Sequence, residues 1–134
     1  NNIFKRKLGS QKDLINDMLK SRLYLIPGHK AELYCLAAEE ARELCIPIVT
    51  MGYGCLSERI IHGETGFLAK PKSASSLAEK INLALELDNS LRKKMTTSAK
   101  KNVERNFSHV RMCEDTLQLY KKCLNEHRIK YEIS

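Results

Sequence analysis

Short apolar runs alternate with amphipathic stretches along the first half of the chain. The apolar runs end at glycine, proline or other turn residues and predict strands, whereas apolar residues recurring every three or four positions predict helices. Strands are expected at residues 3–8, 22–26, 46–51 and 67–69, and helices at 10–19, 33–44 and 57–62. The runs at 22–26 and 46–51 have the composition of buried strands. Strands alternating with helices indicate the α/β class, with a parallel sheet and crossover helices.

The second half of the chain lacks strand patterns and predicts three helices. Ser76-x-x-Glu79 has the spacing of a capping box, like Ser10-x-x-Asp13 before the first helix, and Asp88 and Ser108 precede the last two helices as N-caps. The expected fold is a partial Rossmann-like parallel sheet flanked by helices, with a C-terminal helical tail. Residues 1–70 would hold the sheet, and the helices of residues 71–134 would pack on the same domain.

Charge is unevenly distributed along the 134 residues. The 23 basic and 16 acidic residues give a net charge of +7. Residues 1–70 carry a net charge of +2 and residues 71–134 a net charge of +5. The excess indicates either solvated helix faces or a surface attracted to phosphates or anionic lipid headgroups. Nucleic acid fits less well, because the chain has no tryptophan and shows no interleaving of aromatic with basic residues.

Cysteine usage and hydropathy indicate in which compartment the chain is found and whether it crosses a membrane. The five cysteines form no C-x-x-C pair and no cluster with histidine, which favours reduced thiols in the cytoplasm and no metal site. No apolar run reaches the length of a membrane span, about 18–20 residues. The chain begins at Asn1 on a strand-like run, with neither a methionine nor a leader peptide. We therefore expect a piece of a longer protein.

The predicted helix at 33–44 carries the most informative polar residues. Glu40 falls between Leu36 and Leu44 on the expected apolar face, where an unpartnered carboxylate is costly. Glu32 stands at the helix start, where the helix dipole favours negative charge and where open α/β sheets bind anions and sugars. The two carboxylates could bind hydroxyl groups of one extended ligand. Alternatively, Glu32 is a surface acid and Glu40 pairs with a nearby arginine.

The segments around this helix follow a recognisable order. The matching residues are Glu32, Glu40-Ala41, Ile46-Pro47-Ile48-Val49, Gly54, Glu58 and His62-Gly63-Glu64-Thr65-Gly66-Phe67-Leu68. This order resembles the donor-binding part of family 4 retaining glycosyltransferases, also called glycosyl transferases group 1, which have the GT-B architecture of two Rossmann domains. The family pattern is E-G-F-G-L-V-x-L-E-A-M-A-x-G-x-P-V-V-A-T-x-x-G-G-x-x-E-x-I-x-x-G-x-T-G-F-L. The chain follows it without a gap from Glu32 to Glu58, and the helices from residue 75 to about residue 124 resemble the family's C-terminal tail.

The resemblance implies how a nucleotide-diphosphate sugar would be held. Glu32 would be the catalytic carboxylate, contacting hydroxyls of the donor sugar near the reaction centre. Glu40 would accept hydrogen bonds from the ribose. The sugar and diphosphate would face the backbone N–H groups at Tyr34, Cys35, Leu36 and Ala37. A helix start stabilises a leaving diphosphate without a metal, so no metal and no cofactor are expected.

The expected function follows from the same resemblance. The chain would be a fragment of a hexosyltransferase-like enzyme of glycan biosynthesis, with residues 1–70 as part of its nucleotide-sugar-binding domain. The acceptor, a glycan or a lipid-linked sugar, would be held by an N-terminal domain that this chain lacks, so the isolated chain is expected to be inactive. The enzyme would be cytoplasmic, at the inner face of a membrane if the basic tail makes peripheral contact with anionic lipid.

Several positions depart from the family pattern. Leu33 and Cys35 replace glycines, Cys55 replaces the second glycine of the Gly-Gly turn, and Cys45-Ile46 replaces a glycine-containing pair before the proline. Bulkier residues at 33 and 35 narrow the approach of the backbone to a ligand. They favour the alternative function, a non-catalytic α/β nucleotide-binding or interaction module.

Overall fold

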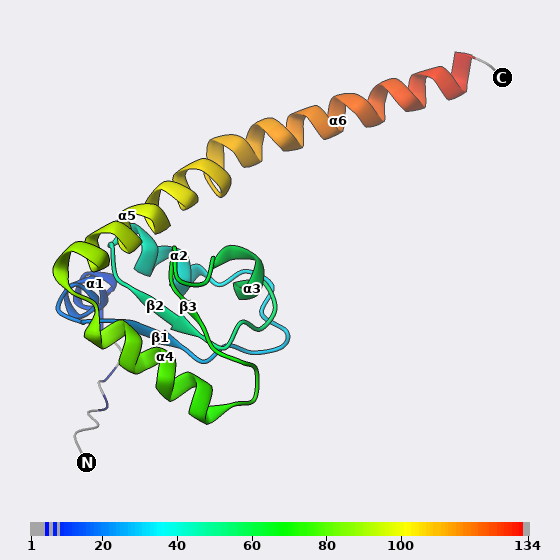
Figure 1. Cartoon of the computed structure of the whole chain (residues 1–134). Coiled ribbons are helices and arrows are strands. Elements are labelled where there is room, and N and C mark those ends of the chain that lie inside the picture. The colour runs from blue at the N-terminus through cyan, green and yellow to red at the C-terminus, as the bar shows by residue number, and fades with distance from the viewer. Residues whose placement is uncertain (1–4, 6, 8, 133–134) are drawn as a thin grey trace. The chain divides into compact units, whose positions relative to one another are not determined.

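A three-stranded parallel sheet lies at the centre of the described part of residues 1–100 (Figure 1). Its strands are β1 (Tyr24–Ile26), β2 (Ile48–Thr50) and β3 (Phe67–Leu68), in the order β1-β2-β3. Leu25 is opposite Val49, and Val49 is opposite Phe67. The parallel sheet confirms the predicted α/β class.

The computed structural model describes residues 5, 7 and 9–132, with side chains as far as residue 126. Contacts divide the chain into residues 1–100 and residues 101–134. The helices are α1 (Gln11–Leu19), α2 (Leu36–Glu43), α3 (Leu56–Arg59), α4 (Ala74–Glu86), α5 (Asn89–Asn106) and α6 (His109–Glu132). None of the helices in the described part is long and apolar enough to cross a membrane.

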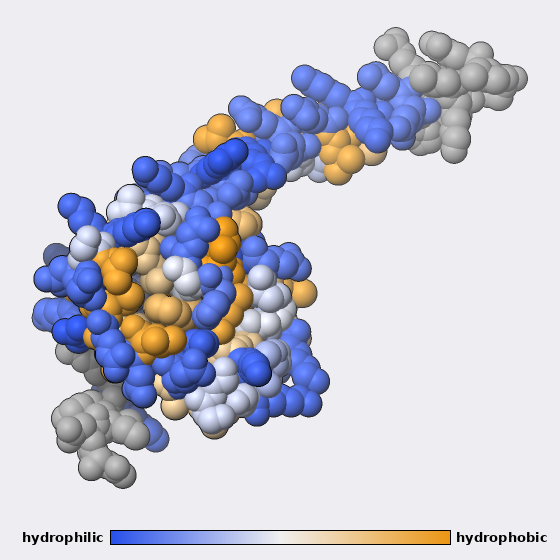
Figure 2. Space-filling model, in the orientation of Figure 1, coloured by the Kyte–Doolittle hydropathy of each residue, from blue (hydrophilic) through white to orange (hydrophobic). Residues whose placement is uncertain are grey.

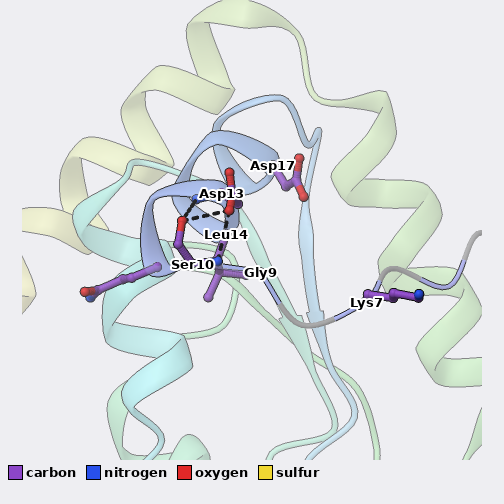
Figure 3. Close-up of a pocket in the computed structure, with 7 residues that line it drawn as sticks. Lys7, Gly9, Ser10, Asp13, Leu14 and Asp17 are labelled. Atoms are coloured by element: carbon purple, nitrogen blue, oxygen red, sulfur yellow. Dashed lines mark hydrogen bonds between the residues drawn. The ribbon is translucent and has the colours of Figure 1, made fainter.

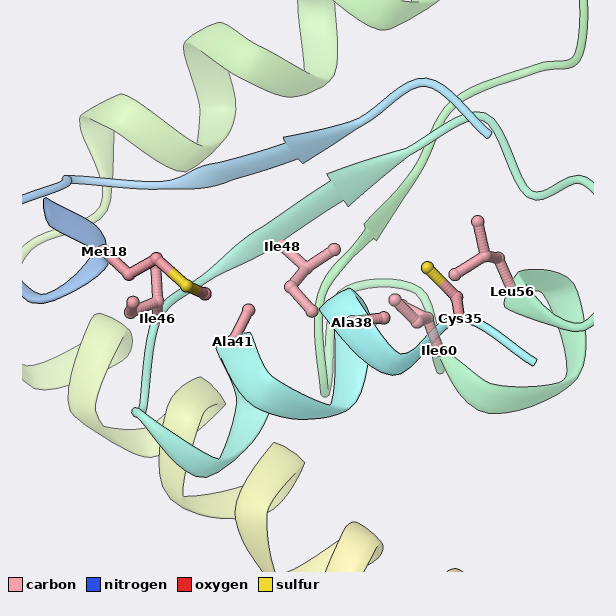
Figure 4. Packing of buried hydrophobic residues seen from close by; sticks show 8 residues of the cluster. All are labelled: Met18, Cys35, Ala38, Ala41, Ile46, Ile48, Leu56 and Ile60. Carbon is pink, nitrogen blue, oxygen red and sulfur yellow. The ribbon is translucent and has the colours of Figure 1, made fainter. Parts of the chain in front are cut away.

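Neighbouring residues of β2 direct side chains to opposite faces of the sheet. Ile48 belongs to a buried cluster with Ala38 and Ala41 of α2 and Met18 of α1 (Figure 4). Val49 belongs to a second cluster, whose other buried members are Phe67, Ala84 and Met95. Since successive strand residues alternate between faces, the sheet has helices on both sides. This layering buries β2 completely, as the sequence predicts for residues 46–51.

The predictions for the other three strands have different outcomes. The strand predicted at residues 3–8 lies largely outside the described residues. The strand predicted at 22–26 is present as β1, but the prediction that it is buried is wrong. In the described sheet β1 has one neighbouring strand, and Leu25 remains 41% exposed. The short strand predicted at 67–69 is confirmed as β3, next to β2.

One of the two predicted capping boxes is present. The Ser10 side chain accepts a hydrogen bond from the Asp13 N–H at 3.3 Å, and the Asp13 carboxylate accepts one from the Ser10 N–H at 2.9 Å. The box predicted at Ser76 is wrong, because Ser73 caps α4 by accepting from the Ser76 N–H at 3.2 Å. Ser76 is buried inside the helix, and its hydroxyl accepts from the Lys70 N–H at 3.0 Å.

Residues 101–134 contain the end of α5 and the whole of α6. The predicted cap at Ser108 is confirmed, since its hydroxyl accepts a hydrogen bond from the Arg111 N–H at 3.3 Å. The described side chains of α6 are exposed, including the predicted apolar positions Leu117 and Leu124. Figure 2 shows apolar patches among polar surface along this helix.

The end of α2 has a left-handed residue that is not glycine. Cys45 has φ +56° and follows the C-cap Leu44. The Cys45 N–H donates to the Arg42 carbonyl at 3.0 Å, and the Ile46 N–H donates to the Ala41 carbonyl at 2.9 Å. These two bonds form a Schellman motif, in which glycine is favoured at the left-handed position. The family pattern accordingly has glycine at position 45, so Cys45 keeps this conformation at a cost.

Replacing Cys45 by glycine is expected to stabilise the domain by about 0.5–1 kcal/mol, because glycine adopts positive φ without a clash of Cβ. Urea unfolding of the longest natural form of the protein measures the change. Cys55→Gly is the matched control, since Cys55 has φ −61° and a glycine there gains no conformational relief. Equal stabilities of the two variants would contradict the expected strain at Cys45.

Candidate functional site

Helix α2 begins at Leu36, three residues later than predicted, and turns a different face to the sheet. Ala38 and Ala41 are fully buried, whereas Leu36 is 67% exposed and Glu40 is exposed. The predicted apolar face around Leu36 and Glu40 is therefore wrong. Small alanine side chains let the helix approach the sheet closely, so the bulkier Leu36 faces outward together with Glu40.

The loop between β1 and α2 holds Glu32 by its backbone. The Glu32 N–H donates to the His29 carbonyl at 3.0 Å, and the Glu32 carbonyl accepts from the Cys55 N–H at 3.1 Å. Gly54, which has φ +54°, packs so closely that a Cβ there would lie 2.4 Å from the Glu32 carbonyl oxygen. Both segments follow the carboxyl ends of parallel strands, the edge where open α/β sheets bind ligands. Glu32 itself is partly buried.

The start of α2 presents backbone donors beside Glu32. The Leu36 N–H is engaged, because it donates to the Tyr34 carbonyl at 3.1 Å. Within the part of the chain that the structure describes, the N–H groups of Tyr34, Cys35 and Ala37 donate to no backbone carbonyl. Burial raises the pKa of the Cys35 thiol, and the charge of Glu32 adds to this effect. The thiol therefore stays protonated at neutral pH and acts as a small apolar group.

Glu40 lines a hollow of about 300 Å³ between α1 and α2. The hollow has an apolar floor that includes Leu14, Ile15 and Leu36, and Glu43 lies beside Glu40 at its margin. Glu32 does not line this hollow: it stands in the loop before α2, whereas Glu40 lies within the helix. An extended ligand with an apolar ring at one end and hydroxyl groups at the other would match this arrangement.

Charge and burial connect Glu40 with the sheet. Burial raises the pKa of the Tyr24 phenol in β1, and the negative charge of Glu40 raises it further. Tyr24 also packs against the apolar cluster beneath α2. The charge of Glu40, which lines the hollow, therefore acts on the phenol of Tyr24 in β1.

A second hollow lies at the beginning of α1 (Figure 3). Its volume is about 590 Å³, and its lining includes Lys7, Gly9 and Asp17. It shares Gln11 and Leu14 with the hollow beside Glu40, but none of the predicted site residues lines it. The two hollows therefore flank the start of α1, and the smaller one carries the predicted carboxylate.

A buried ion-pair network lies next to the predicted site. Glu39 accepts hydrogen bonds from Arg42 at 3.2 Å and from Arg59 at 2.6 Å, and the Arg59 guanidinium carbon lies 3.8 Å from the centre of the Tyr34 ring. Burial lowers the pKa of Arg42, and the charge of Glu39 opposes this change. The sequence hypothesis paired Glu40 with an arginine, but the structure assigns this role to Glu39. Sequence spacing does not predict the contact between Glu39 and Arg59, because Arg59 lies 20 residues further along the chain.

Solved structures share this fold. The chain aligns with sucrose-phosphate synthase from Thermosynechococcus elongatus with a TM-score of 0.69 and 24% identity, covering 79% of this chain and 26% of that one. It aligns with the C-terminal domain of the glycosyl transferase group 1 family protein LpcC from Francisella tularensis with a TM-score of 0.68 and 23% identity. That alignment covers 79% of this chain and 53% of the domain. These similarities support the GT-B type of α/β fold.

Sequence comparison extends the similarity. The capsular polysaccharide biosynthesis glycosyltransferase CapM of Staphylococcus aureus is 29% identical over 104 residues. The match covers 78% of this chain and 27% of CapM, so the chain spans about a quarter of that relative's length. The model of the family described as glycosyl transferases group 1 matches residues 3–102, which is most of the chain. The chain therefore belongs to the glycosyl transferases group 1 family.

Proposed function

We propose that this chain carries part of the donor site of a retaining glycosyltransferase of the family 4 type. The enzyme would transfer a hexose from a nucleotide-diphosphate sugar to an acceptor. The observation that carries the proposal is the placement of Glu32 in the loop that follows the carboxyl end of β1 and leads into α2. Glu40 follows on the exposed side of α2. Family membership supports the same chemistry.

In this proposal Glu40 binds the nucleotide. Its exposed carboxylate would accept hydrogen bonds from the two ribose hydroxyls, and the apolar floor of the adjacent hollow would cover the nucleoside. Hydrogen bonds to a charged acceptor are stronger than neutral ones, so one carboxylate suffices to orient the ribose. The diphosphate would then extend along α2 toward its N-terminus.

Glu32 and the helix start would act at the reaction centre. As the bond from the sugar to the diphosphate breaks, negative charge grows on the diphosphate and positive charge grows on the sugar ring. The N–H groups of Tyr34, Cys35 and Ala37, together with the helix dipole, would stabilise the diphosphate. Leu36, expected to join them, has its N–H committed to Tyr34. The Glu32 carboxylate would bind the sugar hydroxyls and stabilise the positive charge.

Leu33 and Cys35 depart from the family pattern without placing a non-glycine residue at positive φ. Leu33 is 89% exposed, and Cys35 has φ −85°, a backbone conformation open to any residue. Neither position therefore requires glycine for the fold. The alternative, a non-catalytic nucleotide-binding or interaction module, becomes an outcome of the experiments below.

The proposal extends to the partners of the whole enzyme. Its acceptor would be a glycan or a lipid-linked sugar, bound by parts of the protein outside this chain, and the isolated chain would not transfer sugar. The enzyme would work in the cytoplasm at the inner face of a membrane. The net charge of +5 on residues 71–134 supports this location, since basic surfaces are attracted to anionic lipid headgroups.

Glu40→Gln is expected to weaken nucleotide binding about 10-fold, because the ribose hydroxyls lose a charged acceptor.

Glu32→Gln is expected to lower the rate of transfer at least about 100-fold with a smaller effect on nucleotide affinity, since its charge acts in the transition state. Calorimetry with UDP-glucose, GDP-mannose and ADP-glucose, followed by transfer assays, measures both effects in the longest natural form of the protein. Glu79→Gln on the exposed face of α4 is the control. Binding of none of these donors by the wild type would favour the non-catalytic module.

The product is expected to keep the anomeric configuration of the donor sugar. Proton NMR of the product, recorded early in the reaction with the donor that calorimetry identifies, measures this configuration directly. A product of opposite configuration would show an inverting enzyme and would contradict the retaining part of the proposal.

Transfer is expected to persist in excess EDTA, because backbone N–H groups and the helix dipole would stabilise the leaving diphosphate. The measurement compares initial rates before and after exhaustive chelation. Loss of activity that Mg²⁺ or Mn²⁺ restores would show that a metal is required and would contradict the metal-free mechanism.

A further inference from the structure

Arg59, Glu39 and Arg42 form a buried ion-pair network. Glu39 is 8% exposed and Arg59 is 9% exposed, and their side chains meet at 2.6 Å. Arg42, which is fully buried, shares the other oxygen of the same carboxylate at 3.2 Å and also donates to the Ala99 carbonyl at 3.3 Å. The Glu39 carboxylate therefore fixes where the Arg59 guanidinium lies.

The guanidinium in turn lies against an aromatic ring of the donor-site loop. Its carbon is 3.8 Å from the ring centre of Tyr34, within the range of a cation–π contact. Tyr34 lies between Glu32 and the first residue of α2, and it is 48% exposed. The stacked guanidinium is therefore one of the contacts that shield the covered part of this residue from solvent.

We propose that Arg59, oriented by Glu39, is a positioning residue that fixes Tyr34 and, through it, the backbone from Glu32 to Cys35. The role rests on the donor site proposed above. The same short segment, residues 54–59, would hold this loop twice. Cys55 bonds to the Glu32 carbonyl, and Arg59, one turn later, stacks on Tyr34. Glu32 and the N–H groups that follow it would thereby be set at a fixed distance from each other.

The charged residues of this network depart from the family pattern, which has leucine where Glu39 stands and methionine where Arg42 stands. Replacing a buried ion-pair network by apolar residues of similar volume is often neutral or stabilising, so fold stability alone gives weak reason to keep it. A planar guanidinium that must stack on Tyr34 gives a functional reason, because lysine and arginine are not equivalent at a stacked site.

The test is Arg59→Lys in the longest natural form of the protein. Lysine keeps a positive charge for Glu39 but removes the planar group that stacks on Tyr34. We expect the dissociation constant of the tightest binder among UDP-glucose, GDP-mannose and ADP-glucose to rise about five-fold in calorimetry. Arg111→Lys is the matched control, because Arg111 is exposed and pairs with Asp115. It is expected to bind the same donor as tightly as the wild type does.

A double-mutant cycle separates positioning from a general loss of structure. In a Tyr34→Leu background, where no ring remains to be stacked, Arg59→Lys is expected to cause no further loss of affinity. An equal loss in both backgrounds, or unchanged affinity of Arg59→Lys in the wild-type background, would overturn the proposal and leave the donor site standing. If Arg59→Lys fails to fold, unchanged affinity of Tyr34→Leu alone would overturn it. A wild type that binds none of the three donors would overturn the donor site and this role together.

Discussion

The Glu39 carboxylate is the interaction on which this domain's arrangement depends. It allows two guanidinium groups to be buried, one from its own helix and one from α3, and an unpaired charge in either place would cost several kcal/mol. Because Arg42 also reaches the Ala99 carbonyl, the network ties α2 to α3 and α5. Once these charges face inward, α2 has one orientation left, and that orientation exposes Glu40.

The carboxyl edge of the sheet imposes a second constraint, this time on the backbone. Gly54 has to be glycine, since a Cβ would meet the Glu32 carbonyl oxygen and its φ is +54°. Cys45 adopts a similar left-handed conformation without being glycine. The difference is what surrounds each residue. Cys45 is exposed at a helix end, where strain is the only penalty, whereas Gly54 is packed against the loop that carries Glu32.

Periodicity and turn residues were sufficient to predict the parallel α/β sheet and the buried β2. They failed for the face of α2, because hydropathy assigns Leu36 to the core while packing selects the smaller Ala38 and Ala41. They failed for the cap of α4, because Ser73 and Ser76 both have suitable spacing and a tertiary bond engages the second. Contacts between residues far apart in sequence decide such cases, and periodicity carries no information on them.

The charge of the network bears on how α2 could receive an anionic donor. Glu39 lies in the first turn of α2, where a free carboxylate would oppose the binding of a diphosphate at the same helix end. Paired with Arg42 and Arg59, its negative charge is compensated. Buried charges are screened by salt much less than exposed ones, so this compensation persists at physiological ionic strength. The network would therefore remove the repulsion that a free Glu39 carboxylate would exert on a phosphate at the start of α2.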